Sequence, residues 1–145
     1  MFSIFLLISW ITFLFIFIFV SDLSLFLSSL SLTFTFTATP DYTKFLTIYV
    51  IDLSNQSFIL QKFGHAIGFY LLYFFFYLYS KNLKKAFLYS HVLAILTEAA
   101  QPFFGRDGRL LDILINSTGI MICAALCLAY KQIHQLHKKA AYKTT

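Results

Sequence analysis

Four apolar segments, separated by polar or mixed stretches, dominate the pattern of side chains along the chain. They cover residues 1–20, 63–80, 86–101 and 110–130. A helix of about 20 mainly apolar residues spans a hydrocarbon core of about 30 Å. The first segment has no Lys or Arg before it and no small-residue cleavage motif after it, so we expect a retained helix. The pattern predicts an all-α integral membrane protein, a bundle of four transmembrane helices in one domain.

Residues 21–61 interrupt this pattern. Apolar residues recur at helical spacing over 23–30 and then alternate with Ser and Thr at strand spacing over 30–36. Pro40 marks a break, and the apolar stretch 45–53 is too short to span a membrane. We therefore expect a long extracytoplasmic or interfacial segment between the first two transmembrane helices.

The composition agrees with a membrane protein. Of 145 residues, 59% are hydrophobic and 12% are charged, against about 25% charged in soluble domains. The formal net charge is +5, but the lysines lie in short clusters beside apolar runs, as membrane orientation requires. We therefore expect no nucleic-acid partner. Cys123 and Cys127 lie within the last apolar run and are expected to be buried, unpaired side chains.

The lysines also predict an orientation, because short cytoplasmic loops carry an excess of Lys and Arg. The loop 81–85 contains three lysines, and the tail 131–145 is basic as well. Two predicted spans separate these segments, so both are expected on the cytoplasmic side. Both termini are then cytoplasmic, while residues 21–61 and the turn 102–109 lie outside.

In this topology the polar side chains of the apolar segments converge at the outer ends of the helices. Ionisable groups at membrane depth are costly and usually have a function or a partner. We therefore predict a polar pocket that opens to the outer surface. Its candidate residues are Lys62, His65, Glu98, Gln101, Arg106, Asp107, Arg109, Asp112 and Asn116.

Two interpretations of this pocket remain open. In the first, Glu98 or Asp112 is a general base with His65 as its partner in proton transfer. Arg106 or Arg109 would then hold a phosphate or carboxylate in bidentate fashion. In the second interpretation the same groups form only a structural network, in which arginines neutralise the carboxylates and amides bond across helices.

Helical spacing assigns these residues to faces. His91, Glu98 and Gln101 share one predicted stripe, and Gly64 and Gly68 allow close approach of another helix. A second stripe comprises Asp112, Asn116, Gly119 and Cys123. Lys62 is interpreted as an interfacial residue that extends towards the headgroups. No close pair of ligands accompanies the His and acidic candidates, so no metal and no other cofactor is expected.

Four spaced motifs carry a resemblance to a known family. They are Lys62-x-x-His65, Glu98-x-x-Gln101, Gly105-Arg106 and Asp112-x-x-x-Asn116-x-x-Gly119. Over residues 62–130 this set resembles the VanZ-like family, small bacterial membrane proteins associated with resistance to teicoplanin-type glycopeptides. The chain departs from the family pattern at Cys123, where a second glycine is usual, and in a turn before Arg106 that is one residue shorter.

The resemblance implies a multi-pass protein of the bacterial cytoplasmic membrane that acts in envelope homeostasis or teicoplanin resistance. Its partners would be membrane lipids and an outer-leaflet ligand, such as a lipid-linked cell-wall precursor or a lipoglycopeptide. The candidate ligand-binding residues are Lys62, Gln101, Arg106, Arg109 and Asn116. Two alternatives stay open: a hydrolase or transferase of a cell-surface lipid, glycan or peptide that uses His65, Glu98 and Asp112, and a non-catalytic assembly factor.

Overall fold

The described residues of the chain are helical, with no β-strand among them. A computed structural model describes residues 2–21, 23–47 and 56–143. The helices are α1 (Phe2–Phe19), α2 (Leu23–Ser29), α3 (Gln56–Ser80), α4 (Leu83–Ala100), the 3-10 helix η1 (Gln101–Phe104) and α5 (Leu110–Lys143). Three of the helices described are long and apolar enough to cross a membrane, over Phe2–Phe19, Phe58–Ser80 and Leu110–Lys139. Helix α4 is not among these three because two lysines and a glutamate fall within its 18 residues.

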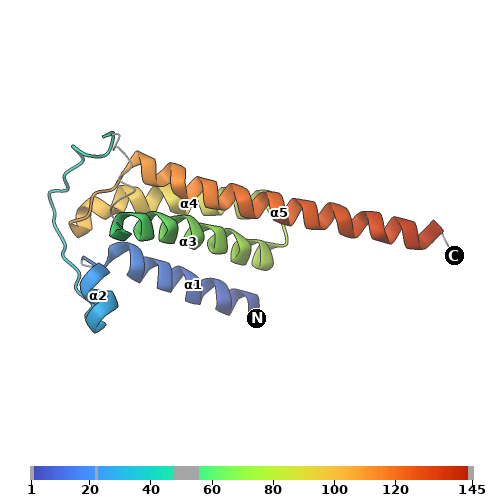
Figure 1. The fold of residues 1–145 in the computed structure, drawn as a ribbon, viewed down its shortest axis with the longest axis horizontal. Helices are drawn as coiled ribbons and strands as arrows, with labels where there is room; N and C mark the ends of the chain where they lie inside the picture. The colour runs from blue at the N-terminus through green and yellow to red at the C-terminus, as the bar shows by residue number, and fades with distance from the viewer. Residues whose placement is uncertain (1, 22, 48–55, 144–145) are drawn as a thin grey trace.

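Helix α3 is the centre of the bundle. It packs against α1, α4 and α5, and its contact with α5 is the most extensive (Figure 1). Phe69, Leu72 and Tyr73 on α3 are each only 1% exposed and form the middle of the apolar core. The outward faces of the helices remain apolar, as expected for surfaces in contact with lipid.

Glycines allow close contacts between helices. A Cβ added at Gly119 of α5 would lie 2.0 Å from the backbone oxygen of Ala66 on α3. A Cβ at Gly68 would lie 2.7 Å from the Leu14 side chain of α1. The Trp10 indole of α1 donates to the Gly68 carbonyl at 3.0 Å, which fixes α1 against α3. The predicted close approach at this glycine pair is therefore confirmed at Gly68.

The helix bounds differ from the predicted ones at three places. Helix α3 begins at Gln56 rather than at residue 63, and α4 begins at Leu83, where the Asn82 side chain caps its first turn. Helix α5 continues past residue 130 to Lys143 and projects beyond the other helices (Figure 1). The tail contains no Gly or Pro to end the helix.

The segment after α1 has helical spacing of apolar residues over 23–30 and strand spacing over 30–36, and only the helical one forms the expected structure. The helical spacing forms α2, whereas residues 30–36 form no strand because none of the described residues pairs with them as a β-ladder. Single backbone bonds instead attach the segment to the bundle end, from Ser21 N to Thr33 O (2.8 Å) and from Thr37 N to Phe103 O (2.8 Å). Residues 48–53 of the predicted interfacial stretch lie outside the described residues.

We expect Gly119→Ala to destabilise the bundle by about 1–3 kcal/mol, because the added methyl group forces α3 and α5 apart. Thermal unfolding of the purified protein in detergent measures the effect. The control is Gly64→Ala, whose Cβ would meet the nearest side chain, that of Phe17, at 3.9 Å. Equal unfolding temperatures for the two variants would contradict the tight α3–α5 contact.

Candidate functional site

The candidate residues lie at one end of the bundle, here called the polar end. It is formed by the first turns of α3 and α5, the last turns of α1 and α4, and η1 (Figure 1). Gly105 ends η1 in the left-handed conformation, with φ of 67°. A Cβ at Gly108 would lie 2.0 Å from the Glu98 carbonyl oxygen. The two glycines thus let the chain fold back tightly over the end of α4 and start α5 beside it.

Glu98 is the hub of the polar end. Its side chain is fully buried and lies among donors from other segments. Asn116 donates through Nδ2 to Oε1 at 3.1 Å, and the Arg109 backbone N–H donates to Oε2 at 3.4 Å. In the amide orientation that satisfies its surroundings, Gln101 donates to Oε2 and to the Asp107 carbonyl, both at 3.2 Å. The carboxylate oxygens are therefore engaged from α5, η1 and the turn between them.

His65 joins α3 to the same hub. Its Nδ1 lies 3.2 Å from Asn116 Oδ1 and 3.4 Å from Glu98 Oε1. Because both neighbours are oxygen acceptors, Nδ1 carries a proton. The Asn116 amide thus bridges the two residues, since its oxygen accepts from His65 while its nitrogen donates to Glu98.

Lys62 and Asp112 form a buried ion pair between α3 and α5. The Lys62 ammonium donates to the Asp112 carboxylate, and their side chains are only 11% and 4% exposed. The ammonium also lies over the Phe58 ring, 5.0 Å from its centroid. The interpretation of Lys62 as an interfacial side chain is therefore wrong, because Asp112 draws the ammonium into the bundle.

Arg106 behaves differently from the other charged groups. It donates through Nη1 to the Val20 carbonyl at the end of α1, at 2.9 Å. No carboxylate among the described residues lies within ion-pair distance of its guanidinium, so other donors hold the Glu98 and Asp112 side chains. Burial lowers the pKa of Arg106, against the opposing influence of the nearby acids, but an arginine remains cationic at neutral pH.

A small cavity of about 20 Å³ lies between α1 and α3 at this arginine. His65 and Arg106 line it together with apolar side chains that include Leu14 and Ile18 of α1. The arginine thus lines a cavity whose other walls are largely apolar side chains of α1 and α3.

Asp107 is the centre of an outer, more exposed cluster. Arg109 Nη2 lies 2.8 Å from its Oδ2, and Lys44 Nζ lies 3.2 Å from both carboxylate oxygens. Partial burial raises the pKa of Asp107, but the bonds from Arg109 and Lys44 outweigh it and bring the pKa below the ordinary 3.8. The stabilisation is therefore fully present above pH 3.8 and is lost as the pH falls through the lowered value.

The structure brings most of the predicted site residues together at the polar end. Eight of the nine candidates lie in the hub around Glu98, in the Lys62–Asp112 ion pair or in the outer cluster around Asp107, and Arg106 lies beside them. These eight are Lys62, His65, Glu98, Gln101, Asp107, Arg109, Asp112 and Asn116. Their catalytic or binding roles remain predictions. No group of three or more potential metal ligands occurs within the described parts of the chain.

Three contacts were not anticipated. The sequence pattern did not indicate the contact of Lys44 with Asp107, because Lys44 lies in an irregular segment. It did not indicate the contact of Arg106 with the Val20 carbonyl either, because that carbonyl is a backbone group. His91 does not share the buried stripe of Glu98; it is half-buried, and its Nδ1 donates to the Phe87 carbonyl at 2.9 Å. The buried face of α4 instead comprises Ala86, Ser90, Ala94 and Glu98.

Fold and site together define a helical membrane protein with a buried polar network at one end of the bundle. The chain is 31% identical over 101 residues to the uncharacterized membrane protein YwnJ of Bacillus subtilis, covering 69% of this chain and 72% of that protein. It belongs to the family of YwnJ. No protein-family model matches the sequence. No solved structure matches it.

We expect Lys62→Met to destabilise the protein by about 3–5 kcal/mol, because it leaves the Asp112 carboxylate buried without its partner. Adding Asp112→Asn removes that stranded charge and recovers most of the loss. Thermal unfolding in detergent measures both. Lys44→Met is the control: it breaks an ion pair whose side chains are 57% and 38% exposed, so it should cost less than about 1 kcal/mol. A similar loss for both lysines would contradict the burial of the Lys62 pair.

Proposed function

We propose that four helices cross the cytoplasmic membrane of a bacterium, with α4 as the fourth, and that the polar end faces outward. The distribution of charge supports this orientation. Lys81, Lys84 and Lys85 are exposed at the opposite end of the bundle, and the exposed end of α5 adds Lys131, Lys138 and Lys139. Cytoplasmic loops carry such an excess of lysine, and this orientation puts both termini inside.

Cysteine labelling tests this topology. In intact cells we expect a membrane-impermeant maleimide to label Thr39→Cys, at an exposed position near the polar end, and not His137→Cys, on the exposed end of α5. Permeabilised cells provide the control, in which both positions should react. Labelling of His137→Cys alone in intact cells would reverse the orientation.

For the polar end we propose the binding of an outer-leaflet ligand through an anionic group at Arg106. The observation that supports this proposal is a difference in hydrogen bonding between Arg106 and the acidic side chains. Glu98 and Asp112 are engaged by donors from this chain, whereas the guanidinium of Arg106 has only the Val20 carbonyl as a hydrogen-bond partner among the described residues. Arginine suits phosphate and carboxylate ligands because its guanidinium offers several donors in one plane.

The resemblance to the VanZ-like family extends this proposal to a biological role. We place the protein in cell-envelope homeostasis, with tolerance of teicoplanin-type glycopeptides as the phenotype to examine. A lipid-linked cell-wall precursor or a lipoglycopeptide combines anionic and lipid parts, and either agrees with a cationic group at the outer leaflet. Catalysis through Glu98 gains no support, because its carboxylate is fully buried and engaged.

A second candidate is the non-catalytic assembly factor, whose polar end acts only as a helix clamp. The observation in its favour is the hub itself, where Glu98 collects donors from α5 and η1. The two candidates differ in the role of Arg106. A ligand site requires this arginine, whereas a helix clamp around Glu98 depends on it little.

The two candidates predict different results for matched substitutions. We expect Glu98→Gln to reduce the protein level in membranes, because the hub loses its acceptor. We expect Arg106→Gln to leave the protein level in membranes within about twofold, because the lost hydrogen bond to the Val20 carbonyl is worth about 1.5–3 kcal/mol at most. The same substitution should abolish any teicoplanin tolerance that the protein confers. Immunoblots and susceptibility assays measure both effects, and Lys85→Gln is the charge control. Unchanged tolerance in Arg106→Gln at a normal level would favour the clamp.

A further inference from the structure

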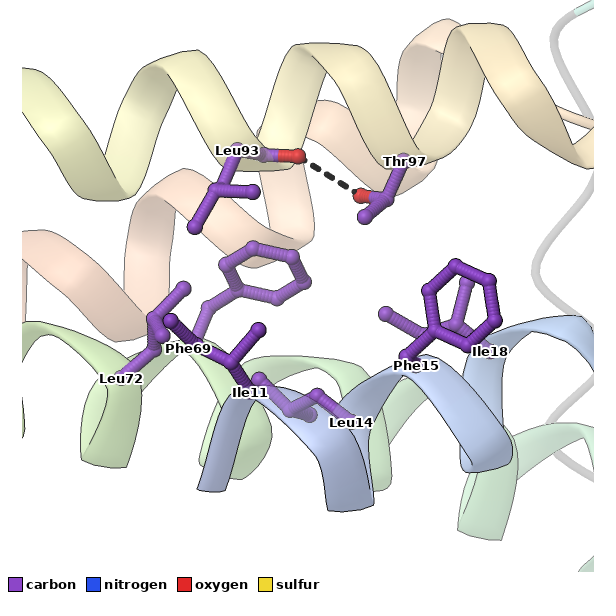
Figure 2. A pocket seen from close by; sticks show the side chains of 8 residues that line it. All are labelled: Ile11, Leu14, Phe15, Ile18, Phe69, Leu72, Leu93 and Thr97. Atoms are coloured by element: carbon purple, nitrogen blue, oxygen red, sulfur yellow. Dashed lines mark hydrogen bonds between the residues drawn. The ribbon is translucent and has the colours of Figure 1, made fainter. Parts of the chain in front are cut away.

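A second cavity lies between α1 and α4, where α3 contributes part of the lining. Ile11 and Phe15 of α1 face Leu93 and Thr97 of α4, while Phe69 of α3 lies behind them in the view of Figure 2. The cavity volume is about 50 Å³. Helix α1 packs on α3 and η1 and leaves this gap towards α4. We call the gap the α1–α4 slot.

The walls of the slot are apolar. Thr97 contributes its one hydroxyl group, which donates to the carbonyls of Leu93 and Ala94 at 2.9 and 3.1 Å. The hydroxyl is therefore satisfied within α4, and the slot offers water no further partner. Dry apolar cavities of this kind accept apolar ligands rather than water.

The slot runs towards Arg106. Leu14, Ile18 and Phe69 line both the slot and the small cavity that is also lined by Arg106 and His65. Along α1 the slot reaches from Ile11 to Ile18, about 10 Å at 1.5 Å per residue. Its mouth is open to the outside of the bundle, because Phe15 at the rim is 49% exposed. In a bilayer this mouth faces the acyl chains.

We propose that the α1–α4 slot holds an acyl chain of an anionic membrane lipid whose phosphate lies at Arg106. The inference rests on the ligand-binding role proposed above and specifies its ligand class. Charge complementarity favours an anionic lipid as the ligand. The Arg106 guanidinium, which has no carboxylate partner among the described residues, lies at the end of the apolar slot. A neutral lipid or a second helix would leave this cation without an anion.

Fluorescence quenching tests the proposal on the full-length protein in neutral detergent micelles. Trp10 is the one tryptophan of the chain and directly precedes Ile11 of the slot. We expect phosphatidylglycerol with brominated acyl chains to quench it saturably, with about tenfold tighter binding than brominated phosphatidylcholine. Arg106→Gln should weaken phosphatidylglycerol binding by about tenfold and remove this preference, while Lys85→Gln should retain it.

Two substitutions test the slot. Ile11→Phe fills it and should weaken phosphatidylglycerol binding by about tenfold or more. Ile8→Phe adds the same ring at a position that is 58% exposed and should have no effect. Thermal unfolding verifies the fold of each variant, and Thr97→Leu fills the slot from α4 if Ile11→Phe does not fold.

Three outcomes would overturn the inference. Equally tight binding of phosphatidylglycerol and phosphatidylcholine, with no change in Arg106→Gln, would mean that lipids surround the protein without selection for the headgroup. Unchanged phosphatidylglycerol binding in Ile11→Phe, with displacement of the lipid by inorganic phosphate, would mean a site for a free anion. That second result would leave the proposed anion-binding role intact. The absence of saturable quenching by either lipid would reject the slot as a lipid site, while the susceptibility assay would still decide the proposed function.

Discussion

The fully buried carboxylate of Glu98 is the constraint on which the polar end depends. A carboxylate removed from water is strongly unfavourable unless hydrogen-bond donors replace its hydration. Here the donors come from Asn116 on α5, Gln101 on η1 and the Arg109 backbone. Asn116 and the Arg109 backbone are in reach only if the turn folds back over the end of α4 and α5 lies against α4. The end of α4, η1 and the start of α5 therefore form one cooperative unit.

The close packing of the helices serves the same unit. Gly108 permits the turn to touch the Glu98 carbonyl, and Gly119 permits α5 to touch the α3 backbone at Ala66. A side chain at either position would move Asn116 or Arg109 away from the carboxylate. Small residues at helix contacts thus determine whether a polar network can be satisfied inside an apolar bundle.

Much of this arrangement follows from the sequence, because apolar runs predict helices and alternating direction brings their polar ends together. The gathering of His65, Glu98 and Asn116 was predicted on that basis. The individual partners were not predictable. Lys62 meets Asp112, 50 residues later in the chain, and this pairing depends on the rotation of α3 against α5. Arg106 meets a backbone carbonyl of α1, and backbone groups leave no trace in a sequence pattern.

The length of α5 has a mechanical consequence. One continuous helix joins Asp112, in the buried ion pair, to Lys139, beyond the rest of the bundle. At 1.5 Å per residue this arm is about 40 Å long, so a tilt of about 5° at the ion pair would swing its far end by roughly 3–4 Å. Small rearrangements around Asp112 are thereby converted into a displacement of the lysine-rich tip.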